Sequence, residues 1–434
     1  MKKFLYSVFM LAAVVLAACS NDDNGDTQPK RGMTLNASVE NLSSRATMTD
    51  ESGTWKFAFA VNDQVSVSNS KISNYYTFTN NGSQFTSAQA EATTENADWY
   101  AYFPGNEVDL KNQTGTFADV ANYFAVAGGT AEATTGEKGL SITLKPKVAV
   151  LRVVAVDKKG ILDIHVKTTA DDKWVKGLTA TKDAADFTVS TSDTKTTLLQ
   201  KAEGKVQAGE INYVVVPAGV KIEIYNGDLL LNKTKDAGLT AGKYYTITSG
   251  PTKGTENVLI NGKETPINWV QLWAGGPRFA TENVDKEMTW TEAAKTGSDY
   301  VWGANWRTPT AAEVTEEGGL QAEWNTKEGK WVVKEGSPTI NVTTKDGIEE
   351  TVEFTGVQPG YTKNTLTLYN KIDSHGYSHF NFWTTTENNG YGCMYRIMID
   401  KGIIGIFGPS SFESKDTKCL VRPVLSIQNI TNNK

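Results

Sequence analysis

Histidine and cysteine are scarce in this sequence, because the 434 residues contain three of each. Zinc centres and many nucleophilic sites are built from these residues, and the HExxH, GxSxG, GxGxxG and P-loop signatures are all missing. Basic residues are also in the minority, with 43 Lys and Arg against 49 Asp and Glu and a net charge of −6. The sequence therefore predicts no enzyme, no cofactor and no nucleic-acid partner.

One histidine pair has a spacing that metal sites use. His375 and His379 are four residues apart and follow Asp373. Gly376, however, stands where an HExxH motif has its glutamate. We therefore expect a surface loop here and no metal site.

The first twenty residues carry the most specific signal. Two lysines precede an apolar core from Phe4 to Leu16, and small residues follow up to Cys19. This run is too short to span a membrane and predicts an export signal over residues 1–18. The "LAAC" stretch resembles the bacterial lipobox. That resemblance implies a lipidated Cys19 and a lipoprotein anchored at the cell surface in the outer membrane.

Residues 19–33 are polar and contain Gly and Pro, so they predict a lipidated, disordered tether. Acidic residues just behind Cys19 resemble a surface-export signal of Bacteroidetes lipoproteins. The other two cysteines, Cys393 and Cys419, are an even pair in an exported chain, where a disulfide can form. Two buried free thiols are the alternative, and the sequence leaves both open.

Alternating apolar and polar residues dominate residues 34–250, and Asn-Gly turns separate the runs. Short strands at regular spacing predict antiparallel β-sandwiches. We expect two of them, at residues 46–139 and 140–250, with a boundary placed to within about fifteen residues.

This region resembles the fimbrillin family, the pilin-like proteins of Bacteroidales. The resemblance rests on the stretches "SSRATMTDESGTWKFAFAVNDQVSVS", "WYAYFPGN" and "INYVVVPAGVKIEIY" with "LTAGKYYTIT". The resemblance implies that residues 34–45 form a removable strand, cut between Arg45 and Ala46 by an arginine-specific protease. The vacated groove would then accept a strand from another fimbrial subunit. Arg31 is a competing cleavage point.

The proposed removable strand alternates along "MTLNASVENLSSR". We expect its inward side chains at Leu35, Ala37, Val39 and Leu42. An emptied groove would expose unpaired backbone groups and apolar core, which is unfavourable until another strand fills it.

Residues 251–434 differ in character, because most of the eleven tryptophans lie beyond residue 268. Thr289 with Glu292, and Thr310 with Glu313, predict capping boxes at the starts of two short helices. Pro309 makes "WRTPT" a rigid corner between a strand and a helix.

The residues around this corner have structural explanations. We interpret Trp302 and Trp306 as core residues, and we expect Arg307 to stack or pair structurally. After the second helix the sequence predicts hairpins, a polar loop region over residues 361–381, and then a small terminal sheet of three strands.

The stretches "NWRTPTAAEV", "FWTTTE" and "CLVRPV" resemble C-type-lectin-like domains, which implies an α+β fold for this part. The calcium-ligating motifs of animal lectins are missing here: Gly360 follows Gln358-Pro359, and Thr384 follows Trp383. Calcium-dependent sugar binding is therefore not expected. A ligand surface for a glycan or a protein would lie on loop aromatics and amides. These candidates are Tyr361, His375, Tyr377, His379, Asn388, Asn389 and Tyr391.

Together these features predict a mainly β chain with two tandem fimbrillin-type sandwiches and a C-type-lectin-like domain. The function they imply is a cell-surface tip or adhesin subunit of a fimbrium. The alternative is a surface glycan-binding lipoprotein that does not polymerise.

Overall fold

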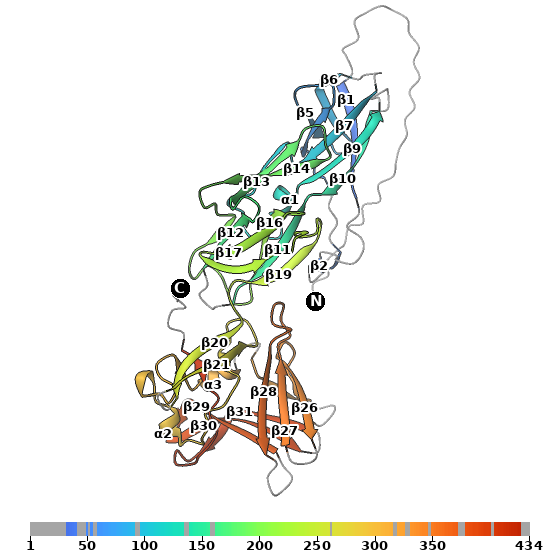
Figure 1. Ribbon diagram of the computed structural model, residues 1–434. Coiled ribbons are helices and arrows are strands. Elements are labelled where there is room, and N and C mark those ends of the chain that lie inside the picture. Colours follow the sequence, from blue (N-terminus) through green and yellow to red (C-terminus); the bar gives the residue numbers. More distant parts are fainter. Residues whose placement is uncertain are drawn as a thin grey trace, which may run out of the picture.

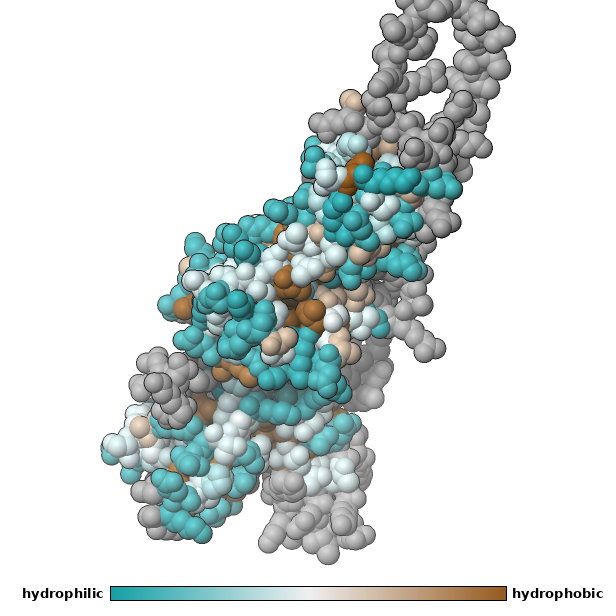
Figure 2. All heavy atoms as spheres, turned by 45° about the horizontal axis from the view of Figure 1, so that its top comes forward, coloured by the Kyte–Doolittle hydropathy of each residue, from teal (hydrophilic) through white to brown (hydrophobic). Residues whose placement is uncertain are grey.

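The computed structural model describes residues 32–40, 49–50, 53–54, 59–91, 96–133, 139–156, 161–260, 263–315, 319–325, 330–345, 349–371, 378–400 and 403–426. The chain is mainly β, as the sequence predicts. Figure 1 shows an elongated molecule in which the sheets follow one another roughly in chain order. The face in Figure 2 is mostly hydrophilic, with apolar residues gathered near its middle.

The first sheet closes into a barrel in the order β1-β10-β9-β7-β4-β5-β6. Val65, Val67 and Phe78 are fully buried inside it, because alternate residues of a strand face the same side. The barrel strands are β1 (Gly32–Val39), β4 (Gln64–Asn69), β5 (Tyr76–Asn80), β6 (Phe85–Glu91), β7 (Ala97–Phe103), β9 (Val126–Ala133) and β10 (Leu140–Pro146). Two short strands, β2 (Thr49–Asp50) and β3 (Gly53–Thr54), pair with each other.

Two further sheets follow the barrel. One has the order β16-β11-β19 and consists of β16 (Ile211–Pro217), β11 (Val148–Val154) and β19 (Tyr244–Thr248). The other has the order β14-β13-β12-β17-β18. In addition, β8 pairs with β13, and β15 pairs with β12. Its strands are β14 (Asp186–Ser192), β13 (Trp174–Thr181), β12 (Leu162–Thr168), β17 (Ile222–Asn226), β18 (Leu229–Lys233), β8 (Glu107–Asp109) and β15 (Leu199–Lys201).

The barrel and these two sheets share one hydrophobic core, which runs from Met33 to Leu239. Strand β8 leaves the barrel segment and pairs antiparallel with β13. The short helix α1 (Val120–Tyr123) contributes the buried Val120 to the same core. The barrel and the two following sheets are therefore joined by an exchanged strand, β8, as well as by a common core.

Strand pairing bears on the expected boundary at residue 139. Although β10 begins at Leu140, it pairs with β1 and β9 inside the barrel. The chain passes from β10 to a strand of another sheet, β11, between Pro146 and Val148. The division into domains itself stays a prediction.

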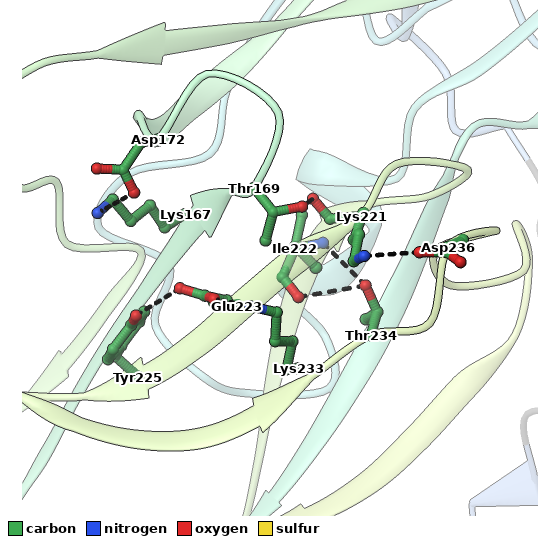
Figure 3. A network of polar contacts seen from close by, with 10 residues as sticks. All are labelled: Lys167, Thr169, Asp172, Lys221, Ile222, Glu223, Tyr225, Lys233, Thr234 and Asp236. Atoms are coloured by element: carbon green, nitrogen blue, oxygen red, sulfur yellow. Dashed lines mark hydrogen bonds and ion pairs between the residues drawn. The ribbon is translucent and has the colours of Figure 1, made fainter.

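Polar contacts tie together the strands β12, β17 and β18 (Figure 3). Glu223 on β17 accepts hydrogen bonds from Lys233 Nζ and Tyr225 Oη, both at 2.6 Å. Lys221 pairs with Asp236, also at 2.6 Å. Asp236 and Lys233 are exposed, and an ion pair with an exposed partner contributes at most about 1 kcal/mol, so we interpret these contacts as structural.

The last part contains four small sheets. The largest has the order β20-β21-β22-β32-β23, formed by β20 (Lys253–Ile260), β21 (Lys263–Gln271), β22 (Arg278–Ala280), β32 (Val424–Leu425) and β23 (Trp306–Arg307). The others are β24 (Ala322–Asn325) with β25 (Lys330–Val333); β26 (Thr339–Lys345), β27 (Glu349–Thr355) and β28 (Thr365–Lys371); and β29 (Ser378–Asn388), β30 (Tyr391–Asp400) and β31 (Ile403–Glu413). The helices are α2 (Trp290–Ala293), the 3₁₀ turn η1 (Gly297–Asp299) and α3 (Ala311–Thr315).

Both predicted capping boxes are confirmed. Thr289 caps α2, and its backbone N–H donates to Glu292 at 2.9 Å. At α3, Thr310 N–H donates to Glu313 at 2.8 Å, and Glu313 N–H donates back to Thr310 Oγ1 at 3.1 Å. The reciprocal bonds satisfy donors that a helix start otherwise leaves unpaired.

The corner before α3 is packed and paired by the residues that surround it. Trp302 and Trp306 are buried, with ring centroids 5.4 Å apart in an edge-to-face contact. Arg307 pairs with Glu313 through both of its terminal nitrogens. The interpretation of these residues as structural is confirmed.

The prediction of a polar loop over residues 361–381 is wrong, because strand β28 lies within this range. Leu366 and Leu368 are buried there, at positions two apart. Their alternation with threonines is a strand pattern that the surrounding polar residues obscured. The predicted three-stranded terminal sheet also differs: "FWTTTENNGYGCMYRIMID" forms a hairpin, and the segment after Cys419 supplies β32 to another sheet.

Candidate functional site

Strand β1 closes the barrel between β10 and β6, and Figure 1 shows it at the end of the molecule beside β6. It runs parallel to β10, with Leu35 opposite Leu140 and Val39 opposite Leu144. It runs antiparallel to β6, with Leu35 opposite Phe85. Both edges of β1 are thus paired, and removing it would open the barrel between β10 and β6.

The inward side chains of β1 follow the predicted alternation. Leu35 is fully buried, and Ala37 and Val39 pack partly buried against the same core. Met33 is also buried, at 2% exposure, so the packed strand starts before the predicted first residue, 34. Met33 is two residues from Leu35, so its side chain faces the same side of the strand, and this spacing could have indicated its burial. Leu42, the fourth predicted inward residue, lies outside the described residues.

Gly139 makes the close approach of β1 possible. It has φ of +71°, and a Cβ placed on it would lie 2.1 Å from Thr34 Oγ1 and 2.5 Å from the Thr34 carbonyl oxygen. Real side chains do not tolerate such contacts, and a positive φ is itself costly for most residues. Sequence reasoning did not single out this glycine, because its partner is about a hundred residues away.

The far end of β1 is held by weaker contacts. Glu40 N–H donates to the Leu144 carbonyl oxygen at 2.8 Å. The Glu40 carboxylate lies 3.6 Å from Lys145 Nζ, and both side chains are more than half exposed. Residues 41–48, which include the predicted cleavage point Arg45–Ala46, lie outside the described residues, as do Cys19 and Arg31. These predictions therefore stay predictions.

Apolar burial and backbone pairing both oppose the release of β1 from its groove. Burying a side chain of the size of Met33 or Leu35 contributes about 1.5–3 kcal/mol, so these two anchors together oppose release by roughly 3–6 kcal/mol. The backbone donors and acceptors of β6 and β10 that face β1 would also lose their partners. An emptied groove would therefore expose apolar core and unpaired backbone groups, which is unfavourable.

Comparisons with known proteins give distant likenesses. No protein-family model matches the sequence, and no curated protein matches it. A solved "putative cell adhesion protein" from Bacteroides uniformis has a TM-score of 0.31 and 14% identity, covering 51% of this chain and 94% of its own. A second from Bacteroides ovatus has a TM-score of 0.30 and 10% identity, covering 55% and 96%. A fimbrial protein from Bacteroides ovatus has a TM-score of 0.25 and 12% identity, covering 91% and 99%.

With TM-scores of this size, the likenesses assign neither a family nor a function to this chain.

The prediction that Tyr361 contacts a ligand is corrected by the structure, because this side chain is buried. Its side chain is fully buried and packs with Val154 and Val156 of the preceding part of the chain. Beside it, Gly275 N–H donates to the Val156 carbonyl oxygen at 2.8 Å. Tyr361 therefore joins the last part of the chain to the middle sheets, because its loop is covered by them, and it offers no atom to a ligand.

Three of the other candidates share one exposed hairpin tip. Asn388, Asn389 and Tyr391 surround the turn between β29 and β30, and Tyr391 is 52% exposed. His375 and Tyr377 lie outside the described residues. His379 lies on β29, and the structure does not describe its side chain. The structure thus brings together the hairpin members of the predicted set, and not Tyr361.

The structure decides between the two alternatives that the sequence left open for the cysteines. Cys393 and Cys419 are both free and buried, and Cys419 Sγ donates to Met394 Sδ at 3.2 Å. Burial raises the pKa of Cys393, and it raises the pKa of Cys419 to about 12, so both thiols stay protonated at neutral pH. Of the two alternatives, free buried thiols are the one found, because each cysteine packs into the interior.

Within the described part of the chain, no cluster of three or more His, Cys, Asp or Glu could hold a metal ion. No described helix is long and apolar enough to cross a membrane.

Proposed function

We propose that this protein is a fimbrial tip or adhesin subunit at the cell surface, assembled by exchange of its β1 strand. The observation that carries the proposal is the placement of β1, which closes the barrel through backbone pairing and two buried anchors, Met33 and Leu35. A cut after Arg45 would leave it without a covalent link to the barrel. A strand from a neighbouring subunit would then restore the lost pairs.

Two further elements belong to the proposal. Cys19 carries lipid and anchors the chain to the outer membrane until assembly. The last part of the chain, residues 251–434, is a C-type-lectin-like adhesive domain that binds a glycan or a protein ligand. The exposed hairpin tip around Tyr391 supports a contact surface there, because exposed aromatics and amides suit both kinds of ligand.

Proteolysis of the purified protein tests the strand exchange. We expect an arginine-specific protease to cut after Arg45 and to release β1 only once a competing strand is supplied. A labelled peptide with the sequence of residues 32–40 should then enter the groove, while the same peptide carrying Leu35→Asp should not. Mass spectrometry reports the cut, and fluorescence anisotropy reports peptide entry.

Matched variants give the controls. Arg45→Ala should block release of β1, whereas Arg31→Ala should leave it unchanged, because a cut at residue 31 lies before the strand. Strand exchange is rejected if the cut chain neither accepts the peptide nor enters fimbriae on cells. In that case the surface glycan-binding lipoprotein that does not polymerise becomes the better explanation.

A further inference from the structure

A hollow of about 360 Å³ opens between the β20–β21 hairpin and the turn that precedes β28. None of the predicted ligand-binding residues lies in it. Its volume falls in the range of small-ligand sites. The lining residues are Lys253, Gly254, Thr255, Asn268, Trp269, Val270, Thr281, Lys363, Asn364 and Thr365.

The charged groups of the hollow are all cationic. Lys253 and Lys363 are exposed at its rim, and neither has an ion-pair partner among the described residues. None of the lining residues carries a carboxylate, although the whole chain has a net charge of −6. The hollow is therefore a local positive region on an acidic protein.

Neutral hydrogen-bonding groups lie beside the lysines. Asn268 is exposed and accepts a hydrogen bond from Thr255 Oγ1 at 2.8 Å, which positions its amide. Thr281 N–H donates to the Asn268 carbonyl oxygen at 2.8 Å and holds this wall in place. The wall thus presents a positioned amide donor and threonine hydroxyls.

Trp269 lies at the floor of the hollow and is 6% exposed, because most of its indole belongs to the core. Arg278 lies 5.4 Å from the centroid of its ring, which fixes the indole from inside the protein. On the other strand, Gly254 adds no side chain, where a Cβ would come within 2.8 Å of the ring. The Gly254 backbone therefore lies against the indole, and a larger residue at position 254 would clash with it.

We propose that this hollow binds a sugar that bears a carboxylate, as part of an acidic glycan. The two lysines complement the carboxylate, and the amide and hydroxyl groups match sugar hydroxyls. The inference deepens the adhesive part of the proposed function, on which it rests, and it does not depend on strand exchange.

Titration calorimetry with the full chain tests the site. The probes are trigalacturonic acid and sialyllactose, with neutral galactotriose and lactose as their uncharged counterparts. We expect at least one acidic probe to bind and its neutral counterpart to bind at least about tenfold more weakly. Added salt should weaken the acidic binding. The proposal is overturned if neither acidic probe binds, or if acidic and neutral probes bind equally.

Variants locate the binding. The double variant Lys253→Gln and Lys363→Gln should weaken the acidic probe about tenfold or more. Lys263→Gln should change nothing, because it alters an exposed lysine at the opposite end of the same hairpin. If Tyr391→Ala abolishes binding and the double lysine variant does not, the ligand sits at the hairpin tip. That outcome refutes the hollow and keeps the adhesive function, whereas a defect in Arg45→Ala alone would concern assembly only.

Discussion

Gly139 has a positive φ and lies in close contact with Thr34 of β1. Its positive φ and its contact with Thr34 act together, and they can be separated by comparison with Gly204, which has φ of +74° and open space around its Cβ position. We expect Gly139→Ala to destabilise the protein more than Gly204→Ala, by about 1–3 kcal/mol beyond the shared strain. Urea unfolding of both variants measures the difference.

The same comparison after removal of β1 gives a sharper result. Once Thr34 is gone, Gly139→Ala and Gly204→Ala should cost similar amounts. A difference that persists would mean that Gly139 is constrained by the barrel itself and not by β1.

Glu313 makes stability at the helix corner depend on pH. Burial raises the pKa of this carboxyl, but hydrogen bonds from Arg307 and the Thr310 backbone outweigh it and hold the pKa below its ordinary value of 4.5. A lowered pKa in the folded state contributes stability above the unfolded value, and this stability is lost as pH falls through the folded value. Acidification should therefore weaken this part of the chain.

Glu313→Gln tests that link. We expect it to lower the free energy of unfolding by about 1–3 kcal/mol at neutral pH, since it removes a charge-assisted hydrogen bond. The difference from the native protein should shrink as the pH falls below 4.5. Glu335→Gln, at an exposed turn, is the control and should have little effect at any pH. A loss that is equal at low pH would contradict the electrostatic origin.

At the scale of elements, β1 is a strand whose two faces should respond differently to mutation. Leu35→Ala creates a cavity in the barrel and should cost about 2–5 kcal/mol, whereas Asn36→Ala on the exposed face should stay within about 0.5 kcal/mol. Hydrogen exchange should become faster in β6 and β10 for the first variant only. Equal protection in both variants would show that β1 does not hold the barrel closed.

The short helices were readable from sequence, and β28 was not, for a physical reason. A capping box is a local pattern in which Thr310 and Glu313 satisfy one another without help from the rest of the fold. The burial of Leu366 and Leu368 depends on β27, which pairs with β28. Polar neighbours therefore concealed an element that only sheet pairing makes stable.

At the scale of the whole molecule, an aromatic bridge joins the barrel to the sheet beyond it. The Tyr102 hydroxyl donates to the carbonyl oxygens of Thr181 and Ala184, at 2.9 and 2.7 Å. Its ring lies edge-to-face with Tyr75 and Phe187. Burial raises the pKa of Tyr102 to about 12, so the hydroxyl remains a donor throughout the neutral range.

Because of this bridge and the shared core, we expect the barrel and the following sheets to unfold together. Tyr102→Phe should keep the packing, lower stability by about 1–2 kcal/mol and reduce the coupling between the two parts. Calorimetry and hydrogen exchange together measure this. Two well-separated transitions for the barrel and the middle sheets in the native protein would refute the expectation.

The sequence by itself determined the mainly β character, the alternation of β1 and the two capping boxes, because each depends on residues that are neighbours along the chain. Only the tertiary structure decided that β1 lies between β10 and β6, that Tyr361 is buried and that Cys393 and Cys419 are free thiols. It also brought Lys253 and Lys363 to one hollow. These outcomes depend on contacts between segments tens to hundreds of residues apart, and local patterns do not specify which of those segments meet.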